Sequence, residues 1–212
     1  MAISAYKVRQ VLAHLAEAYP DARSELDFET PWQLLVATML SAQCTDKRVN
    51  MITPRIFSRY PDAEHLMRVP LEELEDLIRD CGLYHTKAKN ILATARVVAE
   101  VYKNQVPEDR ERLMELPGVG RKTANVVMAN AFGADAIAVD THVFRVAHRL
   151  GWATAKDPEG TERELMQLLP QRSWSVAHHW LILHGRRVCR AARPDCADCC
   201  VSRWCTKVGI AR

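Results

Sequence analysis

Four cysteines in the last part of the sequence have the spacing of a metal site. Cys189, Cys196, Cys199 and Cys205 follow the pattern C-x6-C-x2-C-x5-C, so all four thiols fall within one loop of 17 residues. Thiols this close together indicate a metal site more than disulfides in a chain expected to be intracellular. Zinc sites usually pair two C-x2-C units across a longer gap, whereas this loop has one such unit. The spacing therefore favours a [4Fe–4S] cluster, which a single loop can wrap, over zinc.

Other residues of metal-binding types are interpreted as structural. Cys200 is a spare thiol, and Cys44 and Cys81 are predicted to be small buried apolar residues. Three histidines near the cysteines resemble a metal constellation only superficially. We expect them to be core residues or to face phosphate, and they are His178, His179 and His184.

A second candidate site is the stretch Leu116–Ala124, which reads LPGVGRKTA. Pro117 and Gly118 follow a polar helical segment, so the chain must turn there. Gly118 and Gly120 allow left-handed backbone angles and lack the side chains that would block a close approach. The sequence after Gly120 is strongly helical, so the first backbone N–H groups of that helix point outward without partners. Such a helix start is a seat for an anion, most often phosphate, although an ordinary glycine-broken helix junction would look the same.

Positive charge is concentrated in the same C-terminal region as the cysteines. From His184 to Arg212 the chain has seven basic residues, among them Arg190 and Arg193, and two acidic ones. This segment therefore carries a net charge of +5, which leaves −2 for the rest of a chain whose total is +3. A basic region of this kind is expected where a protein meets a polyanion, although basic tails also serve only to keep proteins soluble.

Length and hydropathy restrict the class of protein. A chain of 212 residues with 48% hydrophobic residues can form one large domain or two small ones, each with its own core. No apolar run approaches the roughly 20 residues that span a bilayer, and the first residues lack an apolar signal region. We therefore expect a soluble cytoplasmic protein with no membrane partner.

The elements that must position these residues are predicted to be helices. Almost every segment has a helical period, and no segment alternates as a strand does, which predicts a compact all-α protein. The segment at 28–43 opens with Thr30-Pro31 and is apolar all round, so this helix should be central and buried. Gly82 is expected to close the helix that precedes it. The other predicted helices lie at about 6–19, 45–60, 71–81, 86–102, 140–150, 157–169 and 173–188, with a short one between Pro61 and Pro70 and the helix that starts after Gly120.

Three motifs together resemble the endonuclease III family, the bifunctional DNA glycosylase/lyases of the helix-hairpin-helix superfamily. They are LPGVGRKTA at 116–124, VDTH at 139–142 and the cysteine loop, and further matches run from LSAQ at 40–43 through GLY at 82–84. The glycine turn is not specific by itself, but the combination is, and it covers nearly the whole chain.

The resemblance implies two helical domains. One is a six-helix barrel at 24–134 that contains the helix-hairpin-helix motif, and the other joins 1–23 to 135–212 and holds the [4Fe–4S] cluster, with a DNA cleft between them. It also implies a base-excision repair enzyme that acts as a monomer at the bacterial nucleoid. Its partner would be double-stranded DNA with oxidised or ring-saturated pyrimidines or with abasic sites.

Lys122 is the predicted nucleophile. It lies in the first turn of the helix after Gly120, where the positive helix end, a nearby arginine and partial burial all disfavour an ammonium ion. A neutral amine is what attack on a sugar carbon requires. The resemblance implies that Lys122 attacks C1′ of the damaged nucleotide, expels the base and forms a Schiff base, and that β-elimination then cuts the strand on the 3′ side. Without the resemblance, Lys122 would be interpreted as a phosphate contact.

Asp140 lies 18 residues after Lys122, at the predicted start of the next helix. Its residue type suits an N-cap, and an N-cap carboxylate is kept ionised. The resemblance implies that this carboxylate faces C1′, stabilises oxocarbenium-like charge and helps to accept the lysine proton. The capping role and the catalytic role are compatible.

The remaining site residues are expected to contact DNA. An enzyme that acts on a base must flip it out of the duplex, and a side chain must then fill the gap. The resemblance gives that task to Gln43 and Leu83, which would otherwise be interpreted as a surface residue and a core residue. The other residues expected to touch DNA are His142, near the orphaned base, and Gly118, Gly120, Arg121, Arg190 and Arg193.

Two other functions remain open at this point. One is a monofunctional adenine glycosylase of the same superfamily, which Lys122 argues against because that relative lacks the nucleophilic lysine. The other is a non-catalytic DNA-binding module whose cluster is structural or senses redox state. Cleavage of DNA that contains an abasic site separates both from the bifunctional enzyme.

Overall fold

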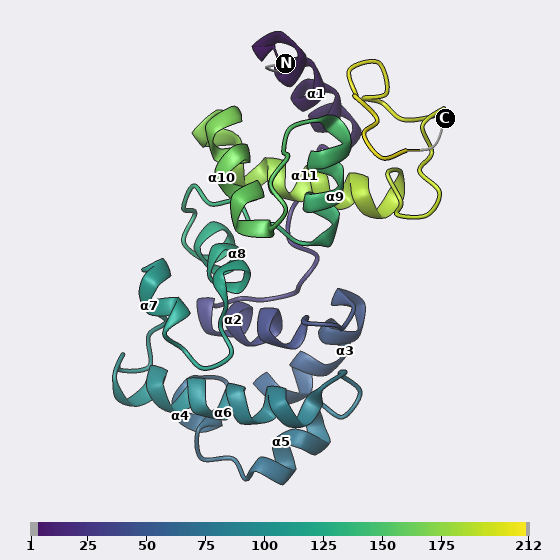
Figure 1. The fold of residues 1–212 in the computed structure, drawn as a ribbon. Coiled ribbons are helices and arrows are strands. Elements are labelled where there is room, and N and C mark those ends of the chain that lie inside the picture. The colour runs from purple at the N-terminus through teal and green to yellow at the C-terminus, as the bar shows by residue number, and fades with distance from the viewer. Residues whose placement is uncertain (1–3, 211–212) are drawn as a thin grey trace. The chain divides into compact units, whose positions relative to one another are not determined.

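The computed structural model describes residues 4–210, and these residues form helices and turns without a strand (Figure 1). This confirms the prediction of an all-α fold. The chain divides into two compact units. Ser24–Ala134 forms the contiguous unit, and Met1–Arg23 with Asp135–Arg212 forms the split unit. Among the described residues, no helix combines the length and the apolar character that crossing a bilayer requires.

The contiguous unit is built around α2 (Pro31–Leu40). Thr30 caps this helix, since its Oγ1 accepts a hydrogen bond from the Gln33 N–H at 3.2 Å, and Pro31 takes the first helical position. Eight of the ten residues are buried, because α3, α6 and α8 all pack against α2. The prediction of a central, buried helix is therefore confirmed. The helices that follow α2 are α3 (Asp46–Phe57), α4 (Ala63–Leu66), α5 (Leu71–Leu77), α6 (Tyr84–Glu100), α7 (Arg110–Met114) and α8 (Arg121–Ala131).

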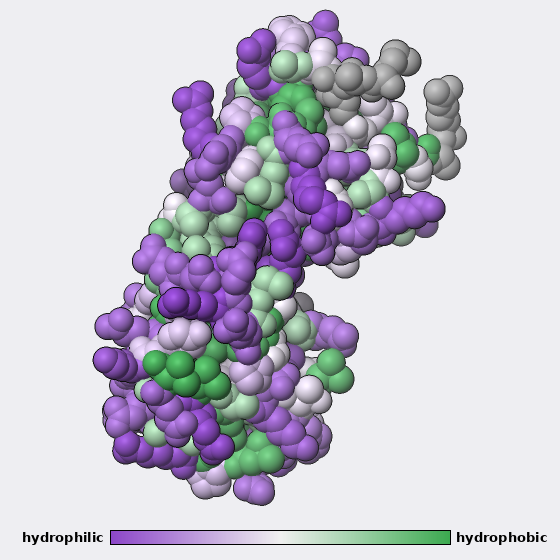
Figure 2. Space-filling view, turned by 60° about the vertical axis from the view of Figure 1, so that its left-hand side comes forward, coloured by the Kyte–Doolittle hydropathy of each residue, from purple (hydrophilic) through white to green (hydrophobic). Residues whose placement is uncertain are grey.

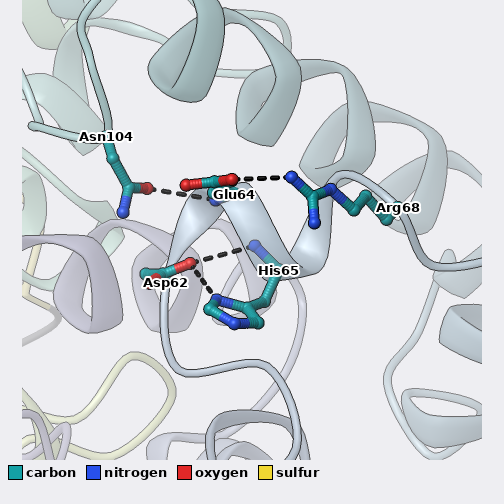
Figure 3. A network of polar contacts seen from close by, with 5 residues as sticks. All are labelled: Asp62, Glu64, His65, Arg68 and Asn104. Atoms are coloured by element: carbon teal, nitrogen blue, oxygen red, sulfur yellow. Dashed lines mark hydrogen bonds and ion pairs between the residues drawn. The ribbon is translucent and has the colours of Figure 1, made fainter.

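The shortest of these helices, α4, depends on polar contacts at its ends (Figure 3). The Asp62 carboxylate accepts hydrogen bonds from the backbone N–H of His65 at 2.9 Å and from its Nδ1 at 2.7 Å. Asn104, which follows α6, accepts a hydrogen bond from the backbone N–H of Glu64 at 3.0 Å. A single helical turn is unstable by itself, so these caps and the packing of α4 against α6 define it.

The split unit joins the two ends of the chain in one core. It contains α1 (Ala5–Ala18), α9 (Thr141–Leu150), α10 (Pro158–Leu168), a short 3-10 turn at Gln171–Ser173 and α11 (Trp174–Arg187). The helix α11 packs against both α9 and α1. Two hydrogen bonds reinforce the contact between α11 and the end of α1. Tyr19 Oη lies 3.1 Å from His184 Nδ1, and Trp180 Nε1 donates to the Tyr19 carbonyl at 3.2 Å. The cysteine loop follows α11 and has no regular helix.

The end of the helix before Gly82 was predicted wrongly. That helix ends at Leu77 and not at Cys81, because Ile78 leaves the helical angles at φ −108° and ψ 13° and buries its side chain completely. Of the two glycines that allow left-handed angles in the 116–124 stretch, Gly120 does not adopt them, since its φ is −92° and its conformation is extended.

Candidate functional site

The turn between α7 and α8 uses its two glycines differently. Gly118 has φ +76°, and a Cβ there would come within 2.7 Å of the Asn90 side chain, so backbone and packing both require glycine. Neither the backbone nor the packing requires glycine at position 120, since φ there is −92° and a Cβ would meet no atom within 4 Å. The bare backbone at Gly120 therefore borders open space, where a ligand can approach closely.

The start of α8 combines that open backbone with two basic residues. Gly120 is the N-cap and provides no side-chain hydrogen bond, and the first turn contains no acidic residue. The first turn of the helix therefore supplies no acidic side chain to the positive helix end. Arg121 is half-buried, and Lys122 is exposed. Partial burial of Lys122 was expected and is wrong, because the buried face of α8 begins at Ala124.

Gln43 and Leu83 protrude from two neighbouring turns of the contiguous unit. Both have left-handed backbones, with φ of 53° and 60°, although neither is a glycine. Both side chains are exposed, and Leu83 is 59% exposed despite being apolar. The turns are close together, since a Cβ on Gly82 would lie 3.3 Å from the Gln43 carbonyl oxygen. Figure 2 shows one face of the molecule, on which hydrophobic residues are scattered among hydrophilic ones.

Asp140 is the N-cap of α9, as its residue type predicted. Its Oδ1 accepts hydrogen bonds from the backbone N–H groups of His142 and Val143, each at 2.8 Å. These two bonds fix the direction of the carboxylate and leave Oδ2 without a capping role. The cap therefore orients a carboxylate at the start of the helix.

The environment of His142 favours its neutral form. Its Nδ1 lies 3.1 Å from Arg145 Nη2, and since a guanidinium only donates, this contact suits an imidazole whose proton is on Nε2. Burial lowers the pKa of His142, which favours the same form. Arg145 also donates to the backbone oxygens of Gly185 at 2.9 Å and Cys189 at 3.0 Å, so α9 connects His142 to the cysteine loop.

The four predicted ligands line one cavity in the split unit, which they share with Arg149 and His184. The cysteines concerned are Cys189, Cys196, Cys199 and Cys205. Within the described residues, no three metal-binding side chains are close enough to hold a single ion. Four thiols of one loop are the donor set that holds a [4Fe–4S] cluster, so the residue types that line the cavity suit this group.

N–H donors also point at the cysteine sulfurs. Arg149 Nη1 lies 3.4 Å from Cys189 Sγ, and the Lys207 N–H lies 3.4 Å from Cys205 Sγ. Donors of this kind stabilise thiolate ligands and tune a cluster. Burial raises the pKa of Cys199 to about 11, so metal binding there would release a proton. The residues present therefore fit an iron–sulfur cluster.

Of the remaining residues that the sequence analysis named, the three histidines are buried and the two arginines of the cysteine loop are exposed. His178, His179 and His184 are 2%, 8% and 1% exposed, so they are core residues and do not face phosphate. Burial lowers the pKa of both His179 and His184 to about 4. Arg190 and Arg193 are exposed.

Sequence reasoning missed three residues that connect candidate site residues to other elements of their own unit. Arg145 and Arg149 were not singled out, although a basic pair at i and i+4 on the helix after Asp140 could have marked a face that contacts the tail. Lys87 was also missed. It is only 6% exposed, and its Nζ donates to the carbonyl of Leu40 at 2.8 Å, which ties α6 to the end of α2.

Comparison with known proteins identifies the family. The model of HhH-GPD superfamily base excision DNA repair proteins matches residues 36–171. The chain is 48% identical over 206 residues to an endonuclease III of Synechocystis sp., which covers 97% of this chain and 94% of the relative. It is 43% identical over 196 residues to the endonuclease III of Escherichia coli K12, with 92% and 93% covered. The chain belongs to the HhH-GPD superfamily.

Solved structures agree with this assignment. The chain is 45% identical to an endonuclease III trapped as a covalent intermediate with DNA, with a TM-score of 0.92 and 97% of both chains covered. A thermostable thymine-DNA glycosylase, at 24% identity and a TM-score of 0.86, has the same fold. This HhH-GPD protein is therefore an enzyme of base excision repair, in the DNA glycosylase/AP lyase class.

Proposed function

We propose that this HhH-GPD enzyme removes oxidised or ring-saturated pyrimidines from duplex DNA and then cuts the strand on the 3′ side by β-elimination. The observation that carries the proposal is an exposed lysine, Lys122, in the first turn of a helix whose start has no side-chain cap. It is supported by 43–48% identity to proteins named endonuclease III, one solved member of which was trapped covalently on DNA.

The chemistry is divided between two residues. The Lys122 amine attacks C1′ of the damaged nucleotide, the base leaves, and the resulting Schiff base activates the sugar for β-elimination. Asp140, oriented by its two backbone hydrogen bonds, stabilises positive charge at C1′ and accepts a proton from the lysine. Bases that have lost aromaticity stack poorly, so they cost less to flip out of the duplex.

The other site residues hold the DNA and the flipped state. The backbone of the Gly118–Gly120 turn and the side chain of Arg121 contact phosphate, together with Arg190 and Arg193 of the cysteine loop. Gln43 and Leu83, which protrude from neighbouring turns, enter the base stack, and His142 lies near the orphaned base. The enzyme acts as a monomer in the bacterial cytoplasm, at the nucleoid.

The four cysteines of the C-terminal loop hold a [4Fe–4S] cluster. The support is a cavity that the four cysteines share and N–H donors toward two of the sulfurs. When bound, such a cluster cross-links the loop and supplies one-electron redox chemistry. We further propose that Ser24–Ala134 is the six-helix barrel domain and that the split unit is the cluster domain.

Borohydride trapping tests the nucleophile. Wild-type protein on duplex DNA with thymine glycol or an abasic site should give a covalent adduct, because reduction converts the Schiff base to a stable amine. Lys122→Ala should lose trapping and strand cleavage together while still binding DNA through the glycine turn. Lys156→Ala, which changes an exposed lysine of the split unit, should behave as wild type.

Each alternative predicts a different result. If Lys122→Ala still gave the adduct, another amine would be the nucleophile and the assignment of Lys122 would be wrong. Base release without any trapping in the wild type would indicate a monofunctional glycosylase. DNA binding without base release or cleavage would indicate a non-catalytic module.

A further inference from the structure

Two cysteines outside the C-terminal loop face each other beneath the turns that carry Gln43 and Leu83. Cys44 Sγ and Cys81 Sγ are 3.6 Å apart, although 37 residues separate them in the sequence, and both are free thiols. Cys81 is 1% exposed and Cys44 is half-buried. The predicted role of both cysteines as small apolar residues explains their burial but not their pairing.

The thiol pair lies where the two turns are already tied together. Lys87 connects α6 to the carbonyl of Leu40, three residues before Gln43, and Gly82 lies against the Gln43 carbonyl. Cys44 directly follows Gln43, and Cys81 precedes Leu83 by two residues. A covalent bond between the sulfurs would therefore link the two turns one residue after Gln43 and two residues before Leu83.

We propose that Cys44 and Cys81 are a site of reversible oxidation, at which a hydroperoxide converts the two thiols to a disulfide that cross-links the turns. In the first step the Cys44 sulfur attacks the peroxide, the O–O bond breaks, an alcohol or water leaves, and Cys44 becomes a sulfenic acid. In the second step the Cys81 sulfur attacks that sulfenic sulfur and the two thiols become a disulfide, with release of water. The two sulfurs supply the two electrons that reduce the hydroperoxide.

The environment of the pair sets this order. Cys44 is the more accessible thiol, so it meets the oxidant first. Burial, followed by the hydrogen bond with Cys44, raises the pKa of Cys81 to about 12, so Cys81 is a protonated thiol and a poor nucleophile toward the oxidant. Closing the gap from 3.6 Å to the roughly 2.05 Å of a disulfide needs only a small movement of the side chains.

Peptide mapping tests the bond without reference to DNA. Trypsin places the two cysteines on separate peptides, 24–47 and 80–87, each with no other cysteine. After treatment of the holoprotein with a hydroperoxide, these peptides should be linked, lack two hydrogens and separate on reduction with dithiothreitol. Cys44→Ser and Cys81→Ala should give no link. Independent alkylation of both thiols, overoxidation of Cys44 without a link, or links from either thiol to the tail cysteines would overturn the proposal.

The consequence for catalysis depends on the function proposed above. A cross-link that holds both turns should slow base excision by about tenfold or more, since a misplacement of about 1 Å in an active site can cost 10²-fold. Oxidised wild type should recover with dithiothreitol, and Cys44→Ser should not be slowed in this way. Because Cys44→Ser keeps every tail cysteine, damage to a cluster would slow both proteins equally.

The failures of the two proposals can be told apart. If the linked peptides form but wild type and Cys44→Ser respond equally to oxidant, the predicted effect on excision is wrong. If the reduced wild type excises no base at all, the proposed function fails, while the peptide map still decides whether the disulfide forms.

Discussion

At the scale of single residues, the left-handed backbone at Leu83 is the clearest sign of function. That conformation costs a non-glycine residue about 1–2 kcal/mol, and Leu83 gains no burial in return, since it is 59% exposed. Leu83→Gly should therefore raise the free energy of unfolding by about 1 kcal/mol and lower the rate of base excision from duplex DNA. Urea denaturation and single-turnover excision measure the two effects.

Lys103 provides a matched control for that experiment. It has a similar left-handed backbone, with φ of 52°, and it is exposed in the same unit. Lys103→Gly should gain similar stability and keep the rate of excision. Equal losses of activity in both variants would assign the effect on Leu83 to backbone flexibility rather than to a lost side chain.

Sequence reasoning found the reactive residue types but not their surroundings. The spacing of the cysteines and the turn before Lys122 could be recognised because glycine, proline and cysteine have distinctive local chemistry. Leu83 without the family resemblance would be assigned to the core, because no residue type signals an exposed leucine in a left-handed turn. The pairing of Cys44 with Cys81 depends on how α2 and α6 pack, which a local pattern does not encode.

At the scale of elements, Asp140 combines a cap with a proposed catalytic role, and two substitutions separate them. Asp140→Asn keeps an oxygen that can accept from the His142 and Val143 N–H groups, so the stability should change little. Asp140→Ala removes the cap and should cost about 1 kcal/mol of unfolding free energy. Both should slow excision by about 10²–10⁴-fold, because both remove the carboxylate.

The variant Asp157→Ala is a control that distinguishes the effect of losing a helix cap from the effect of losing a catalytic carboxylate. It caps α10 in the same unit, accepting from the Gly160 N–H at 2.8 Å. Asp157→Ala should lose as much stability as Asp140→Ala and retain excision. Full activity in Asp140→Asn would remove this carboxylate from the chemistry.

The helix starts were more predictable than the helix ends. Thr30 and Asp140 cap helices where their residue types suggested, because a side-chain oxygen can satisfy a first-turn N–H through purely local geometry. The end of α5 was placed too late. Ile78 ends that helix through burial in the core of the unit, and burial of one residue depends on the packing of distant helices.

At the scale of the whole molecule, binding to DNA should depend steeply on salt, because the proposed contacts are mainly to phosphate. Changing Arg190 and Arg193 together to alanine should flatten the plot of log affinity against log salt by about one unit per lost phosphate contact. Arg163→Ala is the control, since this exposed arginine of α10 pairs with Glu159 at 2.9 Å. An unchanged slope in the double variant would exclude both tail arginines from the interface.

The proposed cluster gives the purified protein a testable composition. The protein should be yellow-brown and contain about four iron and four acid-labile sulfide per chain. Cys196→Ala should lose colour and iron, whereas Cys200→Ala, which changes an exposed neighbouring thiol, should keep both. A colourless protein that contains zinc and is fully active would contradict the assignment.

The split unit also determines the order in which the chain can fold during synthesis. Tyr19 contacts His184, a partner 165 residues later in the sequence. At about 5–20 residues per second, α1 leaves the ribosome roughly 10–30 s before that partner is made. The contiguous unit, which is one uninterrupted segment from Ser24 to Ala134, can fold in that interval. The apolar face of α1, with Val8, Val11 and Leu15, meanwhile has no native partner and is a natural substrate for a nascent-chain chaperone.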